Sequence, residues 1–260
     1  MDSSQLHKSA VQEQFGKTAQ DYVNSPTHAS GQDIVRLVEL TEARPDDVAL
    51  DVATGGGHTA LALAPHVGRI VASDLTPRML EAAREHILGK GIENAEFALA
   101  DAEDMPFEDA SFDIVTCRIA PHHFGDIAAF AREVGRVLKP GGRCVLMDST
   151  SPDDDDLDAF INELEQRRDP THVRSYHLSE WIEVLEAAGL KVNHHEPVIR
   201  AHEYESWTAR SRMTPEDRRA LDEWVLATPE WIREHFGVAI EDGKILHFVD
   251  FKALIRACKP

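Results

Sequence analysis

The sequence has few basic residues for its length of 260. Lys and Arg total 27 against 46 Asp and Glu, which gives a formal net charge of −19 at pH 7. The acidic excess is spread over both halves of the chain, so no basic face or tail is available to hold a polyanion. Because such a field repels phosphate backbones, it argues against nucleic acid as a partner. A small-molecule substrate is expected instead.

Cysteine is also scarce. Cys117, Cys144 and Cys258 are an odd number of residues at wide spacing and form no CxxC pair, which favours neither a disulfide framework nor a zinc site. No stretch of about 18 apolar residues occurs, and the first residues lack the basic and apolar segments of a signal peptide. These absences predict a cytoplasmic protein with no metal and no membrane insertion. They leave the oligomeric state open.

Short apolar runs alternate with helical patterns between residues 48 and 148, which is typical of βαβ units and a parallel sheet. Five strands are predicted here, at about 48–53, 69–74, 95–100, 112–118 and 143–148. Beyond residue 150, helices are predicted to about 168 and at 178–188, 203–211 and 215–236, with strands near 190–199 and at 244–257. The pattern predicts a seven-stranded, mostly parallel sheet with an antiparallel last strand.

The chain divides into three parts on this interpretation. Residues 1–45 are helix-prone and precede the first strand, so we expect them to form a helical lid over the domain. Residues 46–150 make the cofactor-binding core. Residues 151–260 complete the same domain, with a helical cap inserted between the last two strands.

A glycine turn follows the first buried strand. Gly55, Gly56 and Gly57 let the backbone turn sharply and approach a ligand closely. The run from Gly55 to Ala60 satisfies the dinucleotide fingerprint with Ala last, and Asp74 ends the second strand where an acid would bind ribose hydroxyls. This spacing does not separate NAD from S-adenosylmethionine, because both present an adenosine to the same crevice.

Further segments resemble a known family in the expected order. They are the strand and turn Val48–Gly57, Asp74, the segment Asp101–Phe107, the strand start Ser111–Val115 and the turn Leu138–Gly142. Together they are similar to class I S-adenosylmethionine-dependent methyltransferases, within the ubiquinone/menaquinone-methyltransferase-like group (methyltransferase type 11). The resemblance implies a Rossmann-like three-layer α/β sandwich.

The resemblance also implies roles for individual residues. Asp51 would bind the methionine end of the cofactor. Asp74 would bind the ribose, and Asp101 would contact the adenine amino group. The segment 15–22 is similar to the helix that closes over the cofactor in this group. The implied cofactor-binding residues are Tyr22, Asp51, Ala53, Gly55, Gly57, Asp74, Leu75, Asp101, Ala102 and Arg118. One departure is Ala53, which stands where many members have glycine.

Residues for catalysis are less distinct. Methyl transfer is a displacement at an electrophilic sulfonium carbon, so alignment of the reactants lowers much of the barrier, and a base is needed only when the acceptor must lose a proton. His122 and His123 follow the fourth strand and are the candidate bases, and for either one taken singly the alternative is a loop or capping histidine. His172 and Arg174 are candidate acceptor-binding residues, with a solvated turn as the alternative.

The sequence thus predicts transfer of a methyl group from S-adenosylmethionine to a small hydrophobic or aromatic molecule, with S-adenosylhomocysteine as product. An NAD(P)-dependent oxidoreductase is one alternative, but it leaves the segments 101–107 and 138–142 unexplained and lacks a recognisable Tyr-x-x-x-Lys pair. A non-catalytic protein that binds S-adenosylmethionine or S-adenosylhomocysteine is the other.

Overall fold

The computed structural model describes residues 3–23 and 32–260, and of Asp21 and Tyr22 it describes the backbone only. The longer helices in these ranges are α1 (Ser3–Val23), α3 (Gln32–Thr41), α4 (His58–Leu63), α5 (Pro77–Gly89), α6 (Ile127–Val137), α7 (Asp155–Arg168), α8 (Leu178–Ala187), α9 (Tyr204–Arg210), α10 (Pro215–Ala227) and α11 (Glu230–His235). The strands are β1 (Val48–Val52), β2 (Arg69–Asp74), β3 (Ala95–Leu99), β4 (Phe112–Arg118), β5 (Leu138–Thr150), β6 (Lys191–Glu203), β7 (Ala239–Glu241) and β8 (Lys244–Cys258).

Seven of these strands form one sheet in the order β3-β2-β1-β4-β5-β8-β6. The pairs from β3 through β5 are parallel, whereas β8 is antiparallel to both β5 and β6. The seven-stranded prediction with an antiparallel last strand is therefore confirmed along this path. The short strand β7 was not predicted, and it pairs with β8 as a hairpin off the main path.

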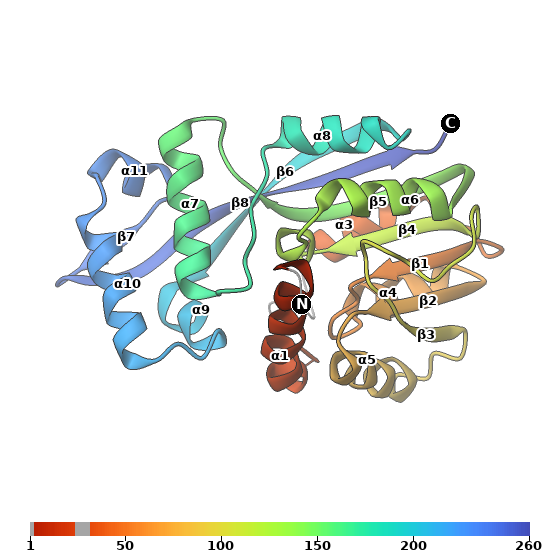
Figure 1. The fold of residues 1–260 in the computed structure, drawn as a ribbon, viewed down its shortest axis with the longest axis horizontal. Helices are drawn as coiled ribbons and strands as arrows, with labels where there is room; N and C mark the ends of the chain where they lie inside the picture. Colours follow the sequence, from red (N-terminus) through yellow and green to blue (C-terminus); the bar gives the residue numbers. More distant parts are fainter. Residues whose placement is uncertain (1–2, 24–31) are drawn as a thin grey trace.

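Helices cover both faces of the sheet (Figure 1), and most positions of the central strands β1, β2 and β4 are therefore buried on either side. Leu50 and Val52 of β1 point to the face covered by α6 and α8, where they join a core that includes Trp181. Ala49 points the opposite way, to the face covered by α4 and α5. This alternation along one strand produces the three-layer sandwich that the family resemblance implied.

In the described part of the first 45 residues, the helices α1 and α3 lie in different places. Phe15 and Ala19 of α1 pack on Met79 of α5, so α1 lies over the carboxyl ends of the strands rather than in the sheet layers (Figure 1). Leu37 and Leu40 of α3 instead pack on β5 and β8 and form part of the core. Of these two helices, α1 lies over the strand ends, where the predicted lid would lie, and α3 does not.

The cap has a core of its own. The helices α7, α9, α10 and α11 surround the far ends of β6 and β8 (Figure 1), and Phe160 of α7 stacks on Trp224 of α10 with ring centroids 5.2 Å apart. The predicted helix 215–236 is two helices, because Pro229 removes a backbone donor and Thr228 before it is extended. Among the described residues, no helix is long and apolar enough to cross a membrane.

Candidate active site

A cleft of about 1060 Å³, open to solvent, lies at the carboxyl ends of β1, β2 and β4 beneath α1. This is the edge of a parallel sheet where ligands bind in open α/β folds. The sequence-predicted residues that line it are Asp51, Ala53, Gly55, Asp74, Leu75, Asp101, Ala102, Arg118 and His123. Gly57, His122, His172 and Arg174 do not line it, and the side chain of Tyr22 lies outside the described residues.

The glycine turn opens directly onto this cleft. Gly55 has a left-handed φ of 55°, and a Cβ placed on it would meet no atom within 4 Å, so the backbone there is free for close approach by a ligand. Gly57 also has a left-handed φ, of 80°, but a Cβ on it would come within 2.9 Å of Ile87. Gly57 therefore serves the packing of α4 against α5 rather than the cleft wall.

Ala53 is the residue that departs from the family pattern, and its backbone conformation shows why glycine is common at this position. Its φ is 51°, in the left-handed region that glycine adopts more easily than alanine. The family glycine at this position thus corresponds to a real backbone requirement. Ala53 meets the same requirement with some strain, while its small side chain keeps the cleft open.

Asp51 supplies a buried carboxylate at the centre of the cleft wall. Its oxygens accept hydrogen bonds from the hydroxyls of Thr54 (2.6 Å) and Thr116 (2.7 Å). Burial nevertheless raises the pKa of Asp51 to about 6, outweighing these hydrogen bonds, which lower it. A buried carboxylate of this kind is suited to a cationic ligand group, because the positive charge of the ligand would offset the negative charge of the carboxylate.

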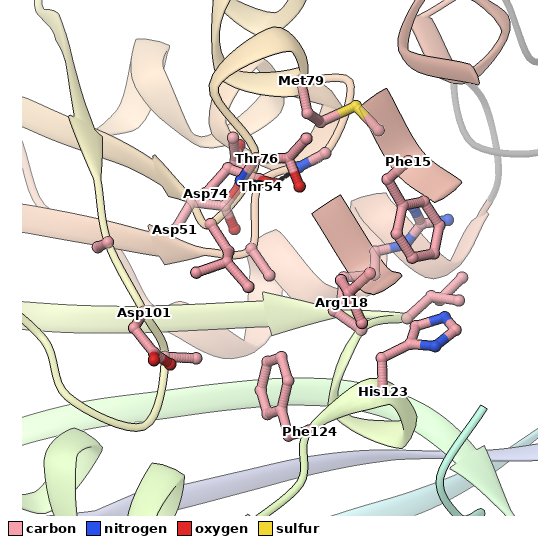
Figure 2. A pocket seen from close by; sticks show the side chains of 18 of the residues that line it. Phe15, Asp51, Thr54, Asp74, Thr76, Met79, Asp101, Arg118, His123 and Phe124 are labelled. Carbon is pink, nitrogen blue, oxygen red and sulfur yellow. Dashed lines mark hydrogen bonds between the residues drawn. The ribbon is translucent and has the colours of Figure 1, made fainter. Parts of the chain in front are cut away.

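Asp74 joins the end of β2 to the glycine turn. Its carboxylate accepts hydrogen bonds from the backbone N–H groups of Gly55 (3.0 Å) and Thr76 (2.8 Å). Burial raises the pKa of Asp74 despite these bonds. The same carboxylate lines the cleft (Figure 2), so a ligand with hydroxyl groups can reach it.

Three polar side chains of α1 attach it to the cleft rim, and the sequence analysis predicted none of them. Lys8 Nζ lies 2.6 Å from Asp101 Oδ2 and 2.7 Å from Glu103 Oε2. Gln12 donates to the backbone oxygen of Leu75 (2.9 Å), and His7 Nε2 lies 2.8 Å from the backbone oxygen of His123. These contacts join residues far apart in the chain, so no local pattern could reveal them.

Arg118 ends β4 with its side chain almost fully buried. Its Nε donates to the Asp33 carboxylate of α3 over 3.1 Å, and its terminal nitrogen also bonds this carboxylate. The next residue, Ile119, has a φ of 54°, which is unusual for a β-branched side chain. Strain of this kind concentrates at functional sites, and both residues line the cleft.

Three imidazole rings lie together beyond the end of β4. The centroid of the His122 ring is 4.2 Å from that of His123 and 5.6 Å from that of His172. His123 Nδ1 lies 2.9 Å from the backbone oxygen of Thr171 and therefore carries the proton that it donates there. Burial is the main reason that the pKa values of His123 and His172 fall to about 3 and about 4.

His172 is thus brought to the histidine cluster, whereas Arg174 is not. His172 Nε2 lies 3.1 Å from Asn162 Oδ1. Arg174 bonds Glu180 at 3.2 Å, and 39% of its side chain is exposed. Within residues 3–23 and 32–260, no group of three His, Cys, Asp or Glu side chains is arranged to hold a metal ion.

Comparison with known proteins agrees with this geometry. A family model described as a methyltransferase domain matches residues 50–146. The uncharacterized methyltransferase YcgJ of Bacillus subtilis is 42% identical over 204 residues, which are 78% of this chain and 80% of YcgJ. The chain belongs to the S-adenosylmethionine-dependent methyltransferases.

Solved structures agree with this assignment. The crystal structure of YcgJ has a TM-score of 0.85 with 35% identity, covering 88% of this chain and 98% of that one. A Bacillus halodurans structure described as that of a methyltransferase has a TM-score of 0.87 with 39% identity, covering 88% and 100%. The demethylmenaquinone methyltransferase of Deinococcus radiodurans is 44% identical, but over 40% of this chain and 43% of its own length.

The cleft of this methyltransferase fits S-adenosylmethionine. The open space over Gly55 leaves room for a ligand, and the buried carboxylate of Asp51 is suited to a positively charged group such as the ammonium of this cofactor. The cofactor supplies an activated methyl group on a positively charged sulfur. The oxidoreductase and the non-catalytic alternatives raised by the sequence are therefore set aside.

Proposed function

We propose that the methyl acceptor is a small hydrophobic or aromatic molecule that binds beside the end of β4. The observation that carries this proposal is the composition of the cleft wall on that side. Phe15, Ile119 and Phe124 all line the cleft, and Figure 2 shows Phe15 and Phe124 near His123, away from Asp51 and Asp74. The net charge of −19 further disfavours a nucleic acid acceptor.

In this proposal the cofactor lies across the ends of β1, β2 and β3. Asp51 holds the methionine ammonium group, and the Gly55 turn with Ala53 admits the methionine end. Asp74 and Leu75 bind the ribose, and Asp101 with Ala102 binds the adenine. Arg118 forms part of the wall between the cofactor and the acceptor. The three free cysteines are in keeping with a reducing cytoplasm as the compartment.

The protein's main contribution to the reaction is then alignment. Holding the acceptor atom in line with the methyl carbon and the sulfur converts a bimolecular reaction into an effectively intramolecular one. His123 faces the cleft as a neutral ring and borders the acceptor together with Phe15, whose ring centroid lies 5.0 Å away. His172 packs against His122, on the side away from the cleft. Arg174 stays a candidate for acceptor binding, and its side chain is partly exposed.

Calorimetric titration of the protein with S-adenosylmethionine, S-adenosylhomocysteine and NAD tests the cofactor site. We expect the first two to bind and NAD not to bind. Asp74→Ala should weaken binding by about 10- to 100-fold, since it removes hydrogen bonds to a charged group. Asp46→Ala, which removes an exposed acid before β1, is the matched control and should leave the affinity unchanged.

The acceptor class is tested by mixing the protein and S-adenosylmethionine with panels of small aromatic compounds, aliphatic compounds and tRNA. Release of S-adenosylhomocysteine measures turnover. We expect turnover with members of the aromatic panel. Turnover with tRNA alone would contradict the proposed acceptor class while leaving the cofactor assignment standing.

A further inference from the structure

Behind the wall of the cleft, His122 forms a pair with a buried acid. His122 Nδ1 lies 2.6 Å from Asp148 Oδ1, and only 1% of the Asp148 side chain is exposed. Asp148 lies on the same face of β5 as Cys144 and Leu146, where apolar side chains form the core. A carboxylate at such a position is costly to bury, and a buried ion pair is weak evidence of a stabilising role.

The hydrogen bond to Asp148 determines where the proton of the His122 ring lies. An ionised carboxylate can only accept a hydrogen bond, so Nδ1 carries the ring proton and donates the hydrogen bond. In the neutral ring, Nε2 then keeps its lone pair. Among the described residues no group bonds Nε2, and 10% of the His122 side chain is exposed. His122 therefore has two features of a general base, which are a ring nitrogen without a hydrogen-bond partner among the described residues and an acid positioned to stabilise the protonated ring.

The other two imidazoles of the cluster lack this arrangement. His123 donates to a backbone carbonyl, and His172 bonds the neutral side chain of Asn162. Their lowered pKa values keep both rings neutral at physiological pH. Only His122, of the three, has a carboxylate as a direct hydrogen-bond partner.

The position of the pair also fits an acceptor rather than the cofactor. Neither His122 nor Asp148 lines the cofactor cleft, but His122 contacts His123, which does. The pair comes from the ends of β4 and β5, adjacent parallel strands, where Arg118 pairs with Met147. In the proposed function the acceptor lies beside the end of β4, and the pair adjoins that end through the contact of His122 with His123.

We infer that His122 is the general base of the reaction, that Asp148 is its positioning residue, and that the acceptor is a hydroxyl group on an aromatic ring. This inference rests on the proposed function. The hydroxyl proton moves to His122 Nε2, while an electron pair of the oxygen forms the new O–CH₃ bond. The electron pair of the breaking C–S bond returns to sulfur, which loses its positive charge. The protonated His122 is held by Asp148 and then releases its proton to water.

The test compares paired acceptors that differ in one atom, phenol with thiophenol and 2-naphthol with 2-naphthalenethiol. The hydroxyl compounds are protonated near pH 7.5 and need a base, whereas the aromatic thiols are ionised and do not. We expect His122→Gln to lower kcat about a hundredfold or more on the hydroxyl compounds, as loss of a general base does. Activity on the thiols should be retained.

Asp148→Asn should lower kcat on the hydroxyl compounds with KM unchanged. Nitrogen-15 NMR of the His122 ring shows which ring nitrogen carries the proton, a readout that a merely structural role would not move. We expect the Nδ1–H form in the wild type and changed ring-nitrogen chemical shifts in Asp148→Asn. His202→Gln is the matched control, because His202 and Asp250 form another buried pair, 3.0 Å apart, away from the cleft. It should leave both activities unchanged.

Equal loss of activity on hydroxyl and thiol compounds in His122→Gln would overturn the inference and make the pair structural. Wild-type turnover of thiols but of no hydroxyl compound would overturn it as well, while leaving the proposed acceptor class intact. Binding of S-adenosylmethionine without turnover of either panel would overturn both the inference and the aromatic acceptor. Calorimetry on each variant confirms that the cofactor site has remained folded.

Discussion

At the scale of single residues, Asp51 gives the cofactor site a dependence on pH. Its pKa of about 6 in the protein results first from burial. A cationic ligand group requires the ionised carboxylate, and lowering the pH through 6 protonates it. We expect S-adenosylmethionine to bind about tenfold more weakly at pH 5 than at pH 7.5, since one pH unit below the pKa leaves about a tenth of the carboxylate ionised.

Calorimetry across this pH range measures the effect. Asp51→Asn, which keeps the shape of the side chain and removes the titration, should bind weakly and with little dependence on pH. An affinity of the wild type that stays constant between pH 5 and 7.5 would contradict the role proposed for Asp51.

At the scale of elements, we propose that α1 acts as a lid held by its contacts with the cleft rim. Lys8 is central to this attachment, and its pKa is raised because hydrogen bonds to Asp101 and Glu103 outweigh the lowering effect of burial. Without them α1 should leave the cleft more often. Hydrogen bonds to charged groups contribute about 1.5 to 3 kcal/mol, so Lys8→Met should speed the dissociation of S-adenosylmethionine by about tenfold or more.

Stopped-flow measurement of cofactor release checks this expectation. Lys17→Met is the matched control, because Lys17 lies on the same helix but pairs with the exposed Glu13 of that helix. Exposed pairs of this kind contribute about 0 to 1 kcal/mol. Equal dissociation rates for the two variants would show that Lys8 does not hold the lid.

At the scale of the whole molecule, the net charge of −19 produces repulsion among surface carboxylates. Salt screens this repulsion, because the Debye length falls from about 10 Å at 0.1 M to about 3 Å at 1 M. We therefore expect the Tm to rise with added NaCl at pH 7.5. Circular dichroism during heating measures the change.

The same titration at pH 5 is the control. The sequence pI is about 5.1, so the net charge there is near zero and the salt effect should disappear. A Tm that is unaffected by salt at pH 7.5 would mean that the charges on this surface are already spaced or paired well enough to cancel their repulsion.

Local patterns in the sequence were enough to predict the seven strands of the main sheet path and the acids at the ends of β1 and β2. Apolar runs, the glycine turn and acids at the ends of β1 and β2 are local features, and parallel strands bring their carboxyl ends to one edge. Their placement follows once the strands are recognised. The same local signals did not predict β7 or the break at Pro229, since a short hairpin strand and a two-helix cap depend on packing around β8.

Which side chains meet across the site depends on the three-dimensional packing of distant segments. Lys8 reaches Asp101 over 93 positions in the chain, and His122 reaches Asp148 over 26. This packing also separates His123, which lines the cleft, from His122, which lies behind it with an acid, although the two are adjacent in the sequence. Adjacent residues of a tight turn point in different directions, so their surroundings depend on the elements packed against the turn rather than on their order in the chain.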